Sequence, residues 1–228
     1  MLDIWIVNIE GNVTGNPSRL LSRREKERAE RFVDKSDQRR YVRAHAALRA
    51  LASRYEKCRP DELVLDRETK GKPFFRRNNG QRTEWRFNLS HAGNRVLIAF
   101  APKMEIGVDV EIERDLPVCD LARRFFAPTE ATTLQQLAEP HRQAAFFAAW
   151  VRKEACLKAS GTGLSGGLDQ CRVPVTPEKN RWKTTYEGQP WWIADLHMET
   201  GCHAAVAWPA SESVVLRLHP ISFQTLVP

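Results

Sequence analysis

The spacing of hydrophobic and polar residues predicts where the strands of this chain lie. From Ile106 to Glu113 apolar and polar residues alternate, which is typical of a strand with one apolar face and places Asp109 and Glu111 together on the other face. Shorter apolar runs predict further strands at residues 2–7, 85–89, 95–101, 191–196 and 203–208.

Apolar residues at helical intervals predict the helices. The first helical region runs from Ser22 to about residue 56, with a break near residues 34–37, and Ser22 and Glu25 have the spacing of a capping box. Further helices are predicted at residues 118–126 and 140–158, the second ending at Gly161 as a C-cap glycine. Because both halves of the chain combine helices with antiparallel strands, the sequence predicts an α+β fold rather than a parallel doubly wound sheet.

The composition is that of a soluble globular protein with a basic surplus. Of the 228 residues 42% are hydrophobic and 28% charged, and 35 Lys and Arg against 28 Asp and Glu leave a net charge of +7. This surplus favours an anionic partner, but it does not decide between nucleic acid, a phosphorylated cofactor, an acidic protein and a membrane surface.

The cysteines and the N-terminus predict a cytoplasmic protein. The five cysteines are scattered and form no Cys-x-x-Cys pair, which argues against a disulfide framework and against a structural zinc site. The first residues lack the pattern of a signal peptide, and no apolar run has the length of a membrane span.

Three carboxylates suggest a site for a divalent cation. Asp109 and Glu111 leave one strand face roughly 6.6 Å apart along it, which suits two oxygen ligands of Mg²⁺, although acids on an exposed strand face are often without function. Glu154 lies within the apolar stripe of the helix at residues 140–158, where its charge needs compensation. Lys158, one turn later, provides that compensation in a simple helix pair, but Lys153 is surplus to such a pair and favours a site for metal and phosphate together.

Three further polar residues, at a turn or a strand end, are candidates for contact with phosphate. His91 is either a structural histidine or a donor to a phosphate oxygen, with the Ser90 hydroxyl beside it. The two are not a nucleophile and its base, because adjacent strand residues point to opposite faces. Lys72, between a glycine and a proline, is either an exposed turn lysine or a phosphate clamp.

Five short motifs follow one another along the chain: Gly-Lys-Pro at residues 71–73, Phe-Asn-Leu-Ser-His at 87–91, Gly-Val-Asp-Val-Glu at 107–111, Phe-Phe-Ala-Pro-Thr-Glu at 125–130 and Trp-x-x-Lys-Glu-x-x-x-Lys at 150–158. In these motifs and in their order the chain, from about Ser22 to Leu164, resembles the Sfp-type 4′-phosphopantetheinyl transferases. Each motif alone is a weak match, but five in order make a specific one.

The resemblance implies a fold and an activity. The fold is a pseudo-twofold monomer of two similar α+β halves, residues 1–102 and 103–228, with the active site between them. The activity is Mg²⁺-dependent transfer of 4′-phosphopantetheine from coenzyme A to a serine of an apo acyl or peptidyl carrier protein, which releases adenosine 3′,5′-bisphosphate. The nucleophile then belongs to the partner, and the enzyme has no nucleic-acid or membrane partner.

The resemblance also implies the site residues. The Mg²⁺ ligands are Asp109, Glu111 and Glu154. The residues that bind coenzyme A are Arg28, Arg40, Arg43, Lys72, Ser90, His91, Lys153 and Lys158. The catalytic residues are Glu130, Lys153, Glu154 and Lys158, with Glu130 or Glu154 accepting the serine proton directly or through a water.

Two residues depart from the family pattern. Ala92 stands where many members have a second serine, which removes one hydroxyl contact. Glu25 occupies a position that is basic in some members, so we expect the clamp on the 3′-phosphate to be assembled differently.

Two alternatives of other classes remain, a basic nucleic-acid-binding module centred on residues 23–49 and a Mg²⁺-dependent nuclease or phosphatase. For a transferase, the positive surplus predicts docking of an acidic carrier by charge. Candidate docking segments are residues 118–141 and the glycine-rich turn after Lys158.

Overall fold

The computed structural model describes residues 1–11, 13, 15–163, 167–176 and 179–227. Its contacts divide the chain into two compact units. Unit 1 comprises residues 1–68, 73–103 and 215–228, and unit 2 comprises residues 69–72 and 104–214. The sequence prediction divided the chain after residue 102 and assigned the C-terminal segment to the second half, whereas this segment packs in unit 1.

Unit 1 is built on a four-stranded sheet with the order β10-β1-β5-β4. Its strands are β1 (Leu2–Asn8), β4 (Trp85–Ala92), β5 (Arg95–Pro102) and β10 (Leu216–Ser222). The β4–β5 and β1–β5 pairs are antiparallel, but β1 and β10 pair in parallel. The antiparallel strands expected from the sequence are therefore joined by one parallel pair, because β10 reaches β1 after a long connection through unit 2 and not through a hairpin.

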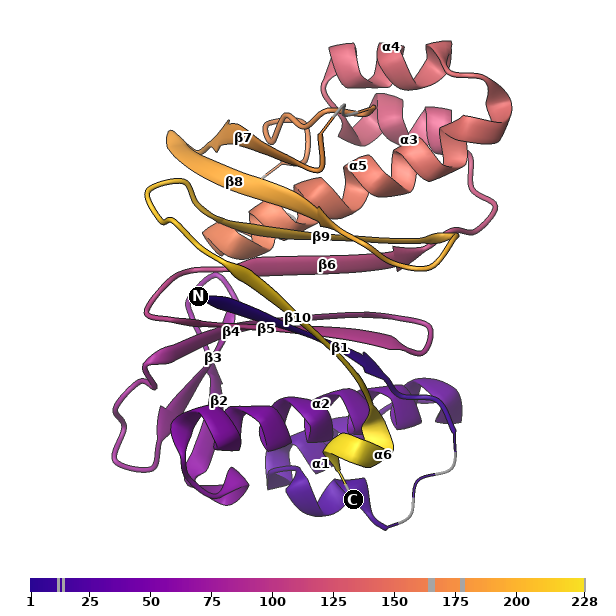
Figure 1. Cartoon of the computed structure of the whole chain (residues 1–228). Coiled ribbons are helices and arrows are strands. Elements are labelled where there is room, and N and C mark those ends of the chain that lie inside the picture. Colours follow the sequence, from indigo (N-terminus) through magenta and orange to yellow (C-terminus); the bar gives the residue numbers. More distant parts are fainter. Residues whose placement is uncertain (12, 14, 164–166, 177–178, 228) are drawn as a thin grey trace. The chain divides into compact units, whose positions relative to one another are not determined.

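Helix α2 lies against this sheet with shorter helices packed around it, and a hairpin completes unit 1. The helices are η1 (Pro17–Leu20), α1 (Arg23–Glu30), α2 (Lys35–Glu56), η2 (Pro60–Glu62) and α6 (Phe223–Leu226), and the hairpin strands are β2 (Leu63–Arg67) and β3 (Pro73–Arg77). Figure 1 shows α2 lying along the sheet, and its apolar stripe shares a core with β1, β4 and β5.

The helix starts predicted in unit 1 are found in the structure. The Ser22 side chain accepts the N–H of Glu25 while the Glu25 side chain accepts the N–H of Ser22, which confirms the capping box. The predicted break in the helical region is also confirmed, because Asp34 caps α2 through the N–H groups of Ser36 and Asp37.

Unit 2 has a second four-stranded sheet, with the order β6-β9-β8-β7. Its strands are β6 (Gly107–Ile112), β7 (Arg181–Tyr186), β8 (Gln189–Leu196) and β9 (Cys202–Pro209), and its helices are α3 (Val118–Phe125), α4 (Pro128–Gln136) and α5 (Glu139–Ser160). Since each unit combines a sheet with helices, the predicted α+β class is confirmed. Among the described residues, no helix combines the length and the apolar character needed to cross a membrane.

Helix α5 packs along β6 and β9, and a glycine sets the distance to β6. A Cβ atom at Gly107 would lie 2.0 Å from the carbonyl oxygen of Ala155 and 2.4 Å from the amide nitrogen of Ala159. Only glycine therefore permits this approach of strand and helix. The helix ends at Gly161, whose φ of 78° confirms the predicted C-cap.

Candidate functional site

The close contact of β6 and α5 positions the predicted carboxylates within unit 2. Asp109 is buried on β6, and its Oδ1 accepts a hydrogen bond of 2.6 Å from Lys158 Nζ on α5. Glu111, two residues further along β6, accepts from Arg114 at 2.8 Å. Glu154 lies on α5, one turn before Lys158, and is 9% exposed. The structure therefore gathers the predicted metal-binding residues around one strand–helix contact.

The charge of Glu154 is poorly compensated. Burial and the neighbouring charge of Asp109 raise the pKa of Glu154 to about 7, with a further contribution from Glu111, while Lys158 opposes the increase. The Glu154 carboxylate makes no hydrogen bond or ion pair with any residue that the structure describes. A carboxylate buried near two others gains from a bound cation, which would hold it ionised.

The donor types fit Mg²⁺, although the side chains do not converge as they stand. Within the described parts of the chain, no three Asp, Glu, His or Cys side chains are close enough together to hold a metal ion. Asp109 is turned to Lys158 and Glu111 to Arg114. Hard carboxylate oxygens and an uncompensated negative charge are nevertheless what Mg²⁺ requires. The assignment of these residues as metal ligands stays a prediction.

Lys153 and Glu130 form a different kind of cluster. Lys153 is fully buried, and its Nζ donates to Glu130 Oε2 at 2.6 Å and to the carbonyls of Leu168 and Cys171 at 2.9 and 2.6 Å. The Glu130 carboxylate also accepts the N–H groups of Ala127 and Val173. All three ammonium hydrogens have protein acceptors, which favours a structural role: the pair joins α4, α5 and the segment at residues 168–173. A contact of either residue with substrate stays a prediction.

Lys72 is not the exposed turn lysine of the first interpretation. It is buried, and its Nζ donates to Glu105 Oε2 at 2.5 Å and to the carbonyl of Ala159 at 2.8 Å. A lysine at this position stabilises the C-terminal turn of α5, where helix carbonyls lack partners. Its role as a phosphate clamp stays a prediction.

The predicted residues of β4 lie in unit 1. Ser90 is buried and His91 is exposed, as expected for neighbours on opposite faces of a strand. The exposed imidazole suits the predicted contact with a phosphate, and that contact also stays a prediction.

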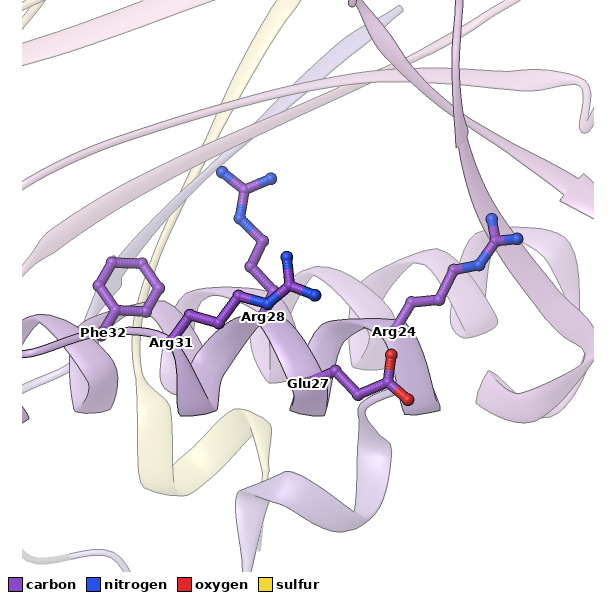
Figure 2. A pocket seen from close by; sticks show the side chains of 5 residues that line it. All are labelled: Arg24, Glu27, Arg28, Arg31 and Phe32. Carbon is purple, nitrogen blue, oxygen red and sulfur yellow. The ribbon is translucent and has the colours of Figure 1, made fainter.

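Of the three arginines predicted to bind the nucleotide, Arg28, Arg40 and Arg43, the structure places only Arg28 in the pocket on α1. Arg28 lines a pocket of about 520 Å³ in unit 1 together with Arg24, Glu27, Arg31 and Phe32. Figure 2 shows the side chains of Arg24, Arg28 and Arg31 on one side of α1. Sequence reasoning missed Arg24 and Arg31, although their spacing of four and three residues from Arg28 is that of one helical face.

The other two predicted arginines have different surroundings. Arg40 pairs with Asp37 at 2.5 Å, and Arg43 donates to the carbonyl of Ile9 at 2.5 Å. Neither lines the pocket of Arg28. Their predicted contact with the nucleotide therefore receives no support from this geometry and stays a prediction.

Glu25, the departure from the family pattern, has a structural position. It is buried, lies 2.8 Å from Nδ1 of His45, and accepts from Arg49 Nε at 2.6 Å and from Ser22. Burial alone would raise the pKa of Glu25, but the hydrogen bond with His45, the charge of Arg49 and the bonds from Ser22 outweigh it and lower the pKa to about 2. Glu25 therefore joins α1 to α2 through His45 and Arg49. This role is consistent with a clamp on the 3′-phosphate that is assembled from other residues.

Of the two candidate docking segments, the structure describes the first in full and the second only in part. Residues 118–136 form α3 and α4, and α3 exposes Arg123 and Arg124. In the glycine-rich turn after Lys158, residues 164–166 lie outside the described residues.

Comparison with known proteins gives a consistent result over nearly the whole chain. Residues 105–208 match the model of the 4′-phosphopantetheinyl transferase superfamily, and residues 16–103 match the N-terminal domain model of 4′-phosphopantetheinyl transferases. A Synechocystis sp. protein, named as a candidate 4′-phosphopantetheinyl transferase (slr0495), is 34% identical over 92% of this chain and 87% of its own length. The 4′-phosphopantetheinyl transferase HetI of Nostoc sp. is 34% identical over 82% of this chain and 78% of its own, and Sfp of Bacillus subtilis is 29% identical over 67% and 66%.

Proposed function

The chain belongs to the 4′-phosphopantetheinyl transferase superfamily, and from this membership we propose the substrates and the residues of its reaction. It is an enzyme that transfers the 4′-phosphopantetheinyl group to carrier proteins. In our proposal the donor is coenzyme A, the acceptor is a serine of an apo acyl or peptidyl carrier protein, and adenosine 3′,5′-bisphosphate leaves.

The observation that carries the proposal for the chemical site is the under-compensated Glu154. Its pKa of about 7 results from burial and from Asp109 beside it, and this arrangement destabilises the protein unless a cation binds. We assign Asp109, Glu111 and Glu154 to hold Mg²⁺, which when bound neutralises charge on the pyrophosphate of coenzyme A. Lys158, half-buried beside Asp109, adds a positive charge for the same phosphate oxygens.

The geometry also supports a choice between the two candidate bases. Both oxygens of Glu130 accept protein hydrogen bonds, from Ala127 and Lys153 at one oxygen and from Val173 at the other. Glu154 has no such donors among the residues that the structure describes, so an oxygen of its carboxylate that is not bound to the metal can accept a hydrogen bond from a water. We therefore propose that Glu154, through a water, accepts the proton of the carrier serine, and that Glu130 holds Lys153 in place.

The nucleotide end of coenzyme A suits the pocket on α1. Its three guanidinium groups, on Arg24, Arg28 and Arg31, offer charge-assisted hydrogen bonds to the 3′-phosphate, and Phe32 offers an apolar surface to the base. His91, Ser90 and Lys72 remain our candidates for the other phosphates.

The decisive experiment is mass spectrometry of an apo carrier protein after incubation with the enzyme, coenzyme A and Mg²⁺. We expect the carrier to gain the mass of one 4′-phosphopantetheinyl group. A carrier with its acceptor serine replaced by alanine should gain none, and neither should a reaction with EDTA. A panel of apo acyl and peptidyl carriers identifies the preferred partner.

Asp109→Ala tests the site itself. It removes a buried carboxylate of β6 and the hydrogen bond that this carboxylate accepts from Lys158, but leaves the apolar core residues unchanged, so we expect the fold to persist and transfer to fall below detection. Circular dichroism and the same mass-spectrometric assay measure the two effects. Near wild-type turnover by Asp109→Ala at saturating Mg²⁺ would overturn the metal assignment, while the absence of transfer by the wild-type enzyme to every carrier would overturn the proposed acceptor.

A further inference from the structure

Unit 1 contains a second basic pocket, and Arg24 is the one residue of its lining that the proposed function uses. It measures about 620 Å³ and lies where η1, the start of α1, η2 and the β2–β3 hairpin meet. Its basic lining residues are Arg19, Arg23, Arg24, Arg49 and Arg76. This volume is in the range of pockets that hold small molecules.

Arg49 is the unusual member of this lining, because its charge is buried. It is 1% exposed, its Nε donates to Glu25 at 2.6 Å, and its Nη1 donates to the carbonyls of Pro60 and Leu63 at 2.7 and 3.0 Å. The buried Nη2 has no hydrogen-bond acceptor among the residues that the structure describes. A buried donor left without an acceptor is costly, so an acceptor supplied by a ligand would stabilise this group.

The pocket also has more positive charge than its own acids compensate. Arg23 pairs with Glu27 and Arg76 with Asp66, whereas Arg19 and Arg24 form no ion pair with a described residue. The one acid of the lining, Asp61, pairs with Arg59 outside it. The remaining charge at the pocket therefore favours an anion.

Apolar side chains form the other part of the lining. Leu20, Leu63 and Leu65 lie beside the arginines, with Pro60 and Val64. A free inorganic anion would leave this surface without a partner. We propose that the pocket binds a small organic phosphate, a monoester whose phosphate contacts the arginines and whose compact apolar body lies against the leucines.

This site is distinct from the pocket assigned to the nucleotide of coenzyme A. Arg24 lines both pockets, but Arg28, Arg31 and Phe32 line only the first, and Arg19, Arg49 and Arg76 line only the second. The inference therefore goes beyond the proposed function, and either can fail without the other.

Calorimetric titration with phenyl phosphate tests the site, because this probe joins a phosphate dianion to a compact apolar ring. The titration is done on the whole protein at constant ionic strength with coenzyme A saturating, so that the proposed nucleotide site is filled. We expect one binding site, with inorganic phosphate about tenfold weaker for lack of the ring and phenol without measurable binding.

Substitutions locate the binding. Arg19→Gln and Arg76→Gln should each weaken phenyl phosphate about tenfold, the loss of one charge-assisted hydrogen bond. The matched control Arg217→Gln, an exposed arginine of β10 in the same unit, should leave binding unchanged. Arg19→Gln should also leave the kcat of transfer and the KM for coenzyme A unchanged.

Other outcomes overturn the proposal. They are the absence of phenyl phosphate binding, equal binding by wild type and both pocket variants, and inorganic phosphate binding as tightly as phenyl phosphate. If phenyl phosphate does not bind while Arg19→Gln raises the KM for the carrier, the pocket belongs to a protein docking surface instead.

Discussion

Glu25 in unit 1 and Glu154 in unit 2 are both buried helical glutamates, yet their pKa values are shifted in opposite directions. Glu25 is 4% exposed and Glu154 is 9% exposed, so burial acts against both charges. The pKa of Glu25 is lowered to about 2, because hydrogen bonds with His45 and Ser22 and the charge of Arg49 outweigh its burial. The pKa of Glu154 is raised to about 7, since Asp109 adds to the effect of burial.

The difference separates a structural carboxylate from a functional one. Glu25 has protein donors on both oxygens, so any further ligand would have to displace them. Glu154 makes no hydrogen bond with a described residue and faces other acids, an arrangement that only an added cation or proton stabilises. By the same criterion Glu130 is a structural carboxylate like Glu25, because its oxygens accept hydrogen bonds from Lys153 and from two backbone N–H groups.

The largest expected effect is on turnover. Glu154→Gln keeps the shape of the side chain but removes a charge that would bind Mg²⁺, so we expect kcat for transfer to fall about a thousandfold, about 4 kcal/mol in activation free energy. Its thermal stability should be equal to or above that of the wild type, because a repulsive charge is gone. The matched control is Glu139→Gln, an exposed glutamate of the same helix, which should change neither quantity.

A plain Glu154–Lys158 helix pair makes the opposite prediction. On that interpretation Glu154→Gln loses a little stability and keeps its turnover. Melting curves and initial rates measured on one preparation distinguish the two interpretations. Unchanged turnover would show that Glu154 has a structural role only.

The next effect is on stability in unit 1. Arg49→Met leaves the Glu25 carboxylate buried without its cation, and breaking a buried pair in this way costs about 3–5 kcal/mol. We expect the lower end of this range, because His45 and Ser22 still bind the carboxylate. Urea unfolding measures the change, with Arg39→Met on the exposed side of α2 as the control. A loss below about 1 kcal/mol would show that Arg49 does not hold Glu25 in place.

Lowering the pH should reduce the free energy of unfolding as the carboxylate of Glu25 is protonated. Its pKa is about 2 in the folded protein and near 4.5 as a free side chain, so its contribution to stability is complete above pH 4.5 and is lost as the pH falls to 2. The whole contribution is about 3 kcal/mol. Urea unfolding at pH 5 and pH 2.5 should show a smaller stability loss for Glu25→Gln than for the wild type, and equal losses would contradict the assignment.

The smallest expected effect is on the KM for the carrier protein. Salt screens exposed charges much more than the buried charges around Glu25 and Glu154, so only the docking of the carrier should depend on salt. The net charge of +7 predicts that an acidic carrier associates by charge, with a Debye length of about 8 Å at physiological salt. We expect the KM for apo carrier to rise about fivefold between low and high salt, while kcat changes less, with coenzyme A kept saturating. A KM that is indifferent to salt would indicate apolar docking.

Much of the local structure could be predicted because its causes lie within a few residues of each other. Alternation along residues 106–113 predicts β6 and the shared face of Asp109 and Glu111. The capping box at Ser22 and the left-handed glycine at residue 161 mark helix ends for the same reason. No bounds were predicted for the strands β2, β3, β7 and β10, since their short, half-exposed sequences have weak alternation and depend on pairing with other segments.

By itself, then, the sequence determined the α+β class, the main helices, the order of the family motifs and the candidate carboxylates. Only the tertiary structure decided what adjacent charged residues do. Lys153 and Glu154 are neighbours on α5, yet Lys153 is saturated by Glu130 and two carbonyls while Glu154 lies near Asp109. The physical reason is that hydrogen-bond partners and neighbouring charges come from segments distant in sequence, and these partners, rather than residue type, determine whether a buried charge is structural or available to a ligand.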